Sequence, residues 1–172
     1  MKKIAIIGSG GSGKSTLAQQ LGTQLNLPVH HLDALLWKAN WAATSKEEQR
    51  TIQRELIKNE EWIIDGNYNG TLDIRLNAAD TVIFVDINRW ICIYRVIKRR
   101  IQYHGRSRPD MGSGCEERLN MAFLTWIWNY PETKRPQMLK KLGNLAGDQQ
   151  IIILKSPREV QQFLETSGGG TT

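Results

Sequence analysis

Short apolar runs recur along the chain and are separated by longer stretches with a helical pattern. Five runs predict β-strands, which cover residues 4–7, 29–32, 62–64, 81–85 and 151–154. The stretches between them carry apolar residues at helical spacing, as Leu17, Leu21 and Leu25 illustrate. Strands that alternate with helices are typical of a parallel sheet with helices on both faces. The pattern therefore predicts an α/β fold, with a single domain over residues 1–166.

Local signals indicate where several helices begin and end. Capping boxes predict that one helix starts after Ser45 and runs to about Lys58, and that another starts after Ser156. Two further helices are predicted over residues 88–102 and 116–129, with Pro131 marking the end of the second and helix resuming to residue 141.

Two segments show no regular spacing of apolar residues. The segment at about 103–116 is rich in glycine and charge, which predicts a mobile, arginine-rich lid. Residues 167–172 have nothing to bury and predict a disordered tail.

A motif that directly follows the first predicted strand points to nucleotide binding. Residues 8–15 match G-x-x-x-x-G-K-[ST], the phosphate-binding P-loop. In such a loop the backbone N–H groups wrap the phosphates, the lysine neutralises them and the hydroxyl holds Mg²⁺. The alternative is a glycine-rich turn without a ligand. The motif predicts ATP and Mg²⁺ as cofactors, held by Gly8, Ser9, Gly10, Gly11, Ser12, Gly13, Lys14, Ser15 and Thr16.

Three aspartates that follow predicted strands are candidates for metal binding or catalysis. Asp65 precedes Gly66, and we expect it to serve Mg²⁺ together with Ser15. Asp33 follows the second strand, at the sheet edge where open α/β folds bind ligands. It is the candidate general base for an acceptor hydroxyl, with a helix N-cap as the alternative. Asp86 is expected only to start a helix.

Basic residues are concentrated in one part of the chain. The net charge is +6, from 23 Lys and Arg against 17 Asp and Glu. Seven basic residues and no acid lie between Arg89 and Arg108. Such a cluster suits a polyphosphate clamp, although a basic stripe can also follow a DNA backbone. We expect Arg95 to bind the nucleotide, and Arg99, Arg106 and Arg108 to stabilise the charge of a transferred phosphoryl group.

Candidates for the acceptor site leave alternatives open. Arg75 is a candidate ligand for an anionic acceptor, but an ion pair with Asp73 or Asp80 fits the sequence equally well. Trp37 and Trp41 lie four positions apart, which fits either a core pair or a stacking wall for a ring-bearing acceptor.

Taken together, the P-loop, Asp33, the segment at 62–66 and the basic lid resemble the adenylate-kinase and shikimate-kinase branch of P-loop kinases. The resemblance implies a three-layer α/β/α fold, a five-stranded parallel sheet of order 2-3-1-4-5, and Mg²⁺ linked to Asp65. Asn67 and Tyr68 stand where adenylate kinases carry Phe-Pro-Arg for the acceptor phosphate. This difference points away from adenylate kinase activity and towards kinases that phosphorylate a hydroxyl, with Asn67 as a candidate acceptor ligand.

A second resemblance covers nearly the whole chain, from Ile4 to about Leu164. It is to the DNA topology modulation proteins (FlaR-related), and it is carried by segments at 31–33, 65–68, 71–76, 108–111, 114–115 and 126–128, with Trp37 and Trp41. The family name implies an effect on DNA. However, the chain has no helix-turn-helix signature, RNP motif or zinc-finger spacing, so no motif supports a nucleic-acid partner.

Cysteine usage and the length of the apolar runs bear on the cellular compartment. Cys92 and Cys115 form no C-x-x-C motif, as is typical of a reducing compartment. The first apolar run is shorter than the core of a signal peptide, and none approaches the ~18 residues that span a bilayer. We expect a cytoplasmic protein without a membrane segment.

The sequence thus predicts an ATP- and Mg²⁺-dependent phosphotransferase that acts on a small hydroxylated or nucleotide-like acceptor. The rival hypothesis is a nucleotide-regulated DNA-binding protein that affects DNA topology. The identity of the acceptor and the oligomeric state do not follow from the sequence.

Overall fold

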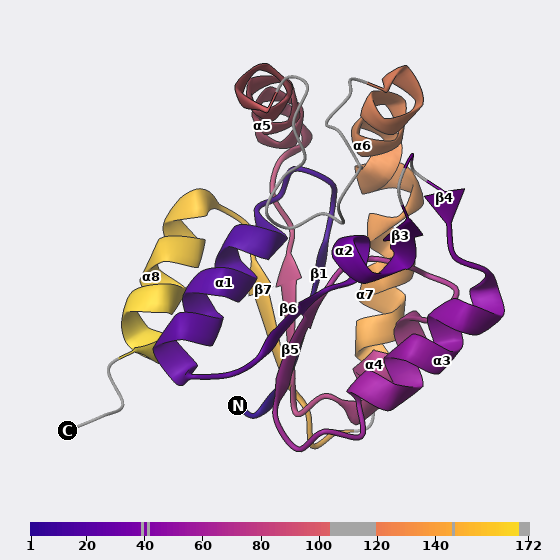
Figure 1. The fold of residues 1–172 in the computed structure, drawn as a ribbon. Coiled ribbons are helices and arrows are strands. Elements are labelled where there is room, and N and C mark those ends of the chain that lie inside the picture. Colours follow the sequence, from indigo (N-terminus) through magenta and orange to yellow (C-terminus); the bar gives the residue numbers. More distant parts are fainter. Residues whose placement is uncertain (39, 41, 104–119, 146, 169–172) are drawn as a thin grey trace.

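A parallel β-sheet forms the centre of the computed structural model, which describes residues 1–38, 40, 42–103, 120–145 and 147–168 (Figure 1). Its strands are β1 (Lys3–Gly8), β2 (Val29–His31), β5 (Trp62–Asp65), β6 (Thr81–Val85) and β7 (Gln150–Leu154). They pair in the order β2-β5-β1-β6-β7, and all four pairings are parallel. In chain order this is 2-3-1-4-5, so the predicted topology is confirmed.

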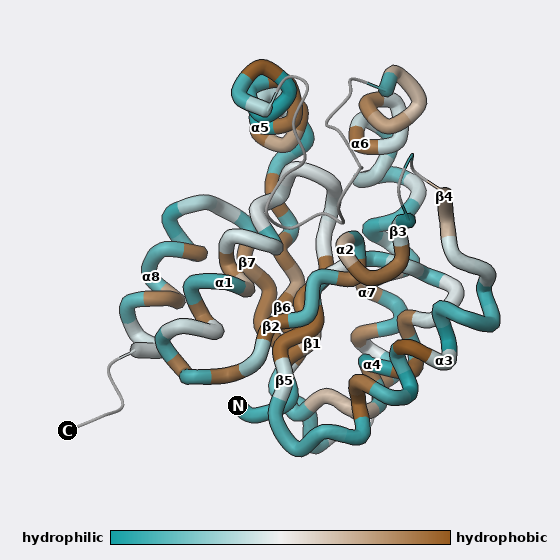
Figure 2. The backbone as a smooth tube through the Cα atoms, in the orientation of Figure 1, coloured by the Kyte–Doolittle hydropathy of each residue, from teal (hydrophilic) through white to brown (hydrophobic). Residues whose placement is uncertain are grey.

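Helices cover both faces of the sheet, which confirms the three-layer arrangement. One face packs against α1 (Lys14–Leu25) and α8 (Pro157–Ser167), and the other against α3 (Lys46–Leu56), α4 (Leu72–Ala78) and α7 (Arg135–Gly143). Because both faces are covered, β1 and β6 are apolar along nearly their whole length, as the brown centre of Figure 2 shows. Each face thus has its own hydrophobic core.

The remaining elements lie beyond the carboxyl ends of the strands. Helices α5 (Arg89–Gln102) and α6 (Met121–Thr133) stand above the sheet in Figure 1. The short helix α2 (Leu32–Leu36) follows β2 and leads into a small antiparallel pair, β3 (Trp37–Lys38) and β4 (Ala42–Ala43). These elements enclose the end of the sheet at which the P-loop lies.

The predicted helix starts are confirmed at the level of individual hydrogen bonds. The Ser45 hydroxyl accepts a bond from the Glu48 backbone N–H at 3.1 Å, and α3 follows directly. The Ser156 hydroxyl accepts in the same way from the Glu159 N–H at 3.2 Å. Each cap satisfies an N–H group that the first turn of a helix otherwise leaves without a partner.

The predicted end of the helix before Pro131 is wrong. Helix α6 runs on to Thr133 and contains Pro131 in its last turn. Proline removes one N–H donor and restricts the preceding residue, which is why it usually ends a helix. Here Tyr130, 4% exposed, is packed into the same core as Met138 and Leu142 of α7, and this burial favours continuation of the helix past the proline.

Two of the predicted segments are only partly described. The predicted lid at 103–116 lies outside the described residues apart from Tyr103, and so do Trp41, Arg106 and Arg108. Helix α8 extends to Ser167, and residues 169–172 of the predicted tail also lie outside. Within the described part of the chain, no helix has both the length and the apolar character needed to cross a bilayer.

Candidate active site

The P-loop turns sharply from β1 into α1, and its backbone requires glycine. Gly8 has a φ of 149° and Gly11 a φ of 74°, conformations that side chains rarely adopt. A Cβ atom at either position would lie 2.4 Å from a backbone carbonyl oxygen, of Val85 and Cys92 respectively. Helix α1 then begins at Lys14, so its free N–H groups lie at the loop.

The loop carries polar atoms that are suited to an anion. The hydroxyl groups of Ser9 and Ser12 are buried without a hydrogen-bond partner in the described chain. The Lys14 ammonium donates to the Ser9 carbonyl at 2.7 Å. Burial lowers the pKa of Lys14, while the nearby carboxylates Asp65 and Asp33 raise it. Ser12 and Lys14 line a pocket, where a bound polyphosphate would satisfy the Ser12 hydroxyl and offset the cost of burying the lysine, so the residues present fit such a group.

A hydroxyl and a carboxylate meet beside the loop. The Ser15 hydroxyl donates to Asp65 Oδ2 at 2.8 Å, and His31 Nδ1 is hydrogen-bonded to Asp65 Oδ1 at 2.6 Å. His31 and Asp65 end the neighbouring strands β2 and β5 in direct register, which places them side by side. Hydroxyl and carboxylate oxygens are hard ligands of the kind that Mg²⁺ prefers, so Ser15 and Asp65 fit this metal. The sequence analysis missed His31, although its place at the end of a strand signalled it.

Asp33 is held by a tyrosine. It lies in the first turn of α2, and the Tyr68 hydroxyl donates to Asp33 Oδ1 at 2.8 Å. Burial, followed by the negative charge of Asp33, raises the pKa of Tyr68 far above its usual range, so the hydroxyl stays protonated as a donor. The Trp37 side chain acts in the opposite direction and lowers the pKa of this hydroxyl, but less strongly. The Tyr68 hydroxyl therefore remains a donor that holds Asp33.

The capping alternative for Asp33 is wrong, because α2 begins at Leu32 and its N-cap residue is His31. The expectation for Asp86 is also wrong. The side chain that caps α5 belongs to Asn88, which accepts from the Trp90 N–H at 2.9 Å. Asp86 instead accepts from Arg135 Nε at 2.8 and 2.9 Å.

Arg75 is fully buried and forms the centre of a hydrogen-bond network. Its Nη2 donates to the carbonyl oxygens of Gly66 at 2.6 Å and Asn67 at 2.7 Å, and its Nη1 donates to Gln53 Oε1 at 2.7 Å. Gln53 in turn donates to the Thr71 hydroxyl. Burial lowers the pKa of Arg75 to about 10, and the guanidinium remains charged at neutral pH.

The two ion pairs considered for Arg75 are not formed. Asp73 pairs with Lys141 at 2.5 Å, and Asp80 accepts from the backbone N–H groups of Lys2 and Lys3. The guanidinium instead bonds to the loop at 65–68, which we call the Asp65 loop. The Asn67 side chain of this loop accepts from the Gly8 N–H at 3.1 Å, which ties it to the start of the P-loop.

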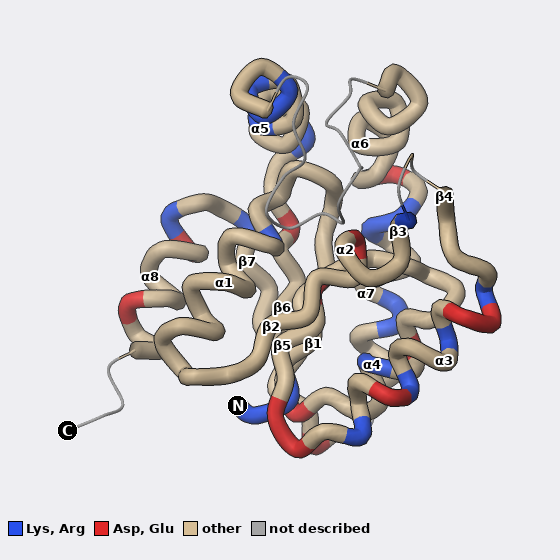
Figure 3. Tube along the Cα trace, viewed as in Figure 1, with Lys and Arg blue, Asp and Glu red and all other residues tan. Residues whose placement is uncertain are grey.

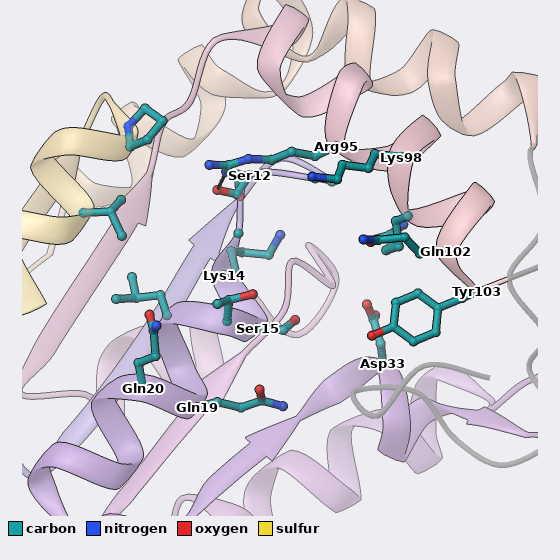
Figure 4. Close-up of a pocket in the computed structure, with 18 of the residues that line it drawn as sticks. Ser12, Lys14, Ser15, Gln19, Gln20, Asp33, Arg95, Lys98, Gln102 and Tyr103 are labelled. Atoms are coloured by element: carbon teal, nitrogen blue, oxygen red, sulfur yellow. Dashed lines mark hydrogen bonds between the residues drawn. The ribbon is translucent and has the colours of Figure 1, made fainter. Parts of the chain in front are cut away.

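The P-loop and Asp33 line one pocket of about 700 Å³ (Figure 4), and Asp65, Tyr68 and Arg75 lie behind its lining residues. The P-loop and Asp33 face each other across it, and Arg95 and Lys98 of α5 lie on its upper side in Figure 4. Arg99 of the same helix also lines the pocket. Arg95 also donates to the Ser12 carbonyl at 2.9 Å. Figure 3 shows that basic positions gather on α5 above the sheet. The structure thus brings the predicted Arg95 and Arg99 to the P-loop, while Arg106 and Arg108 lie outside the described residues.

Comparison with known proteins supports the fold. No protein-family model matches the chain, and no curated protein matches it significantly. Among solved structures, a shikimate kinase from Acinetobacter baumannii in complex with shikimate aligns with a TM-score of 0.61 at 12% identity, over 96% of this chain and 90% of that one. A gluconokinase from Sinorhizobium meliloti 1021 aligns with a TM-score of 0.54 at 13% identity, over 98% and 90%.

A sugar kinase from Janibacter sp. HTCC2649 also aligns, with a TM-score of 0.53 at 16% identity, over 97% of this chain and 92% of that one. At these identities the similarity shows the fold and nothing finer. The chain therefore has the fold of small-molecule P-loop kinases.

We predict that Arg75→Met strongly destabilises the protein. The substitution leaves two buried acceptors and one partly buried acceptor without this donor, which we expect to lower the free energy of unfolding by about 3 kcal/mol or more. Urea denaturation followed by circular dichroism measures this change. Lys141→Met is the matched control, because Lys141 lies at the surface in an exposed ion pair, and its loss should cost less than about 1 kcal/mol. Equal effects of the two substitutions would contradict the structural role of Arg75.

Proposed function

We propose that this protein is an ATP- and Mg²⁺-dependent phosphotransferase that phosphorylates a hydroxyl group of a small acceptor. The observation that carries the proposal is that Lys14, Ser15 and Asp33 line the same pocket. Lys14 and Ser15 suit the phosphates of a nucleotide, and Asp33 is a carboxylate that can accept the proton of a hydroxyl group. The similarity in fold to a shikimate kinase, a gluconokinase and a sugar kinase supports the proposal.

In the proposed reaction, Asp33 accepts the proton of the acceptor hydroxyl. The hydroxyl oxygen attacks the γ-phosphorus of ATP, the bond from this phosphorus to the β,γ-bridging oxygen breaks, and ADP leaves. Lys14 and the guanidinium groups of Arg95 and Arg99 offset the negative charge on the phosphates. We propose the same role for Arg106 and Arg108 of the lid. Mg²⁺ would be held by Ser15 and Asp65 and would supply further neutralisation of the phosphates.

The predicted acceptor residues contribute to this site through Asp33. Trp37 lies near the Tyr68 hydroxyl and lowers its pKa, and Asn67 and Arg75 fix the Asp65 loop that carries Tyr68. We therefore propose that these three residues shape the acceptor site by orienting the Asp33 carboxylate. The acceptor is a small hydroxylated or nucleotide-like molecule.

The resemblance to the DNA topology modulation proteins suggests the alternative function, binding of DNA. The described basic residues Arg95, Lys98 and Arg99 line the nucleotide pocket, whereas a groove binder needs cations on an outer surface that can follow a backbone. We therefore assign these cations to nucleotide phosphates.

Substitutions of Asp33 and of Lys14 should have different effects on phosphoryl transfer and on ATP binding. Asp33→Asn should leave ATP affinity intact and lower the turnover rate by a factor of about 10² to 10⁴, because the general base is lost. Lys14→Ala should abolish ATP binding. Calorimetry measures binding, and ATP consumption in a screen of nucleosides, nucleoside monophosphates, sugars and hydroxy acids measures turnover. Full turnover by Asp33→Asn would refute the assignment of the base.

Loss of the hydroxyl in Tyr68→Phe should affect the chemical step only. We expect the turnover rate to fall about tenfold with unchanged ATP affinity, because Asp33 loses the donor that orients it. In the Asp33→Asn background the same substitution should have no further effect, since the two residues act as one unit. Steady-state kinetics of the four variants provide the test, and additive losses would argue against a shared role.

Binding to duplex DNA should be weak. We expect a dissociation constant above about 10⁻⁴ M at physiological salt, the weak end of non-specific binding. Fluorescence anisotropy with a labelled duplex over a series of salt concentrations measures it. Tight binding with a steep salt dependence that is lost in the triple variant Arg99→Ser, Arg100→Ser and Arg106→Ser would favour the DNA-binding alternative.

A further inference from the structure

A continuous apolar face lies outside the proposed active site. Its side chains are between 40% and 74% exposed, and we call it the outer face: Trp90, Tyr94, Ile97 and Ile101 of α5 with Met121 and Trp128 of α6. On α5 the four residues are spaced four, three and four positions apart, so they form one stripe along the helix. The buried residues of α5, Cys92 and Val96, lie on the opposite side.

The stripes of the two helices are joined by an aromatic contact. The rings of Trp90 and Trp128 meet edge to face, with their centroids 4.8 Å apart. Arg89 lies over the Trp128 ring at 4.7 Å and pairs with Glu132 at 2.7 Å. Met121 and Trp128 are seven positions apart, which places them two turns from each other on one side of α6. The stripe on α5 and the stripe on α6 therefore meet at Trp90 and Trp128.

The distribution of charge on α5 indicates which kind of partner fits this face. Arg95, Lys98 and Arg99 line the pocket, the charge of Arg89 is offset by Glu132, and Arg100 is half-buried. An anionic membrane or a nucleic acid would require cations directed outward beside the apolar stripe. An apolar centre rich in tryptophan and tyrosine is instead characteristic of a protein interface.

The size and the pattern of the face match a second copy of this chain. At about 150–250 Å² for each large side chain, the six residues expose roughly 700 Å². This exceeds the largest apolar patch of a typical monomer, about 300–600 Å², and approaches the ~800 Å² that each partner buries in a stable complex. Spacing of four and three residues is also the repeat by which two similar helices pack along a seam.

We propose that the outer face is the contact between two copies of this chain, in a dimer with a two-fold axis. Helix α5 of one copy packs along α5 of the other, and Trp128 and Met121 extend the contact on each side. This assignment is independent of the proposed function, since no residue of the outer face lines the pocket. The helix that would form the contact, α5, also carries the basic residues Arg95, Lys98 and Arg99 that line the pocket.

The mass of the full chain in solution tests the proposal. Sedimentation equilibrium across about a hundredfold range of concentration should show reversible association to twice the single-chain mass of 19.6 kDa. Tyr94→Glu and Ile101→Glu should each weaken the association at least about tenfold, because a charge enters the apolar contact. Gln162→Glu adds the same charge to an exposed position of α8 and should leave the association unchanged.

Circular dichroism and melting temperature establish that each variant is folded. If Tyr94→Glu is unfolded, Ile101→Glu alone decides, because Ile101 is the most exposed residue of the face. A wild-type protein that stays monomeric at every concentration would overturn the proposal, as would a dimer that both substitutions leave intact. Binding of monomeric protein to anionic phospholipid vesicles, lost in Ile101→Glu, would assign the face to a membrane and would likewise overturn it.

Discussion

The arrangement of the site depends on one buried guanidinium group. Arg75 donates to the carbonyl oxygens of Gly66 and Asn67 and thereby holds the Asp65 loop in place. A buried charge is costly unless strong acceptors surround it, and carbonyl oxygens held at the end of a sheet satisfy this requirement. The same geometry that stabilises the arginine therefore fixes the backbone around which the site is built.

The Asp65 loop links groups that belong to the two halves of the pocket. Asp65 meets the Ser15 hydroxyl on the side of the P-loop, and Tyr68 reaches Asp33 on the opposite side. Asn67 ties the loop to Gly8. One short segment thus sets the position of Asp65, which suits a metal ion, relative to Asp33, which suits the role of a base.

Local sequence was sufficient for some elements and insufficient for others. The caps at Ser45 and Ser156 were predictable because a cap involves residues three positions apart. Pro131 was misread because burial of the neighbouring Tyr130 outweighs the usual effect of proline on a helix. Arg75 was expected to bind a ligand or to pair with a carboxylate. Its actual partners, Gln53 and two backbone carbonyl groups, could not be predicted from the residues near it in the sequence.

The sequence by itself determined the α/β fold and the position of the P-loop, and the resemblance to P-loop kinases implied the strand order. The fold class and the P-loop depend on the periodic spacing of apolar residues and on glycines that the backbone conformation requires, which act over short distances along the chain. Only the tertiary structure decided that His31 lies beside Asp65 and that Tyr68 donates to Asp33. Those contacts join residues 34 and 35 positions apart, and they form only when the parallel strands β2 and β5 are paired.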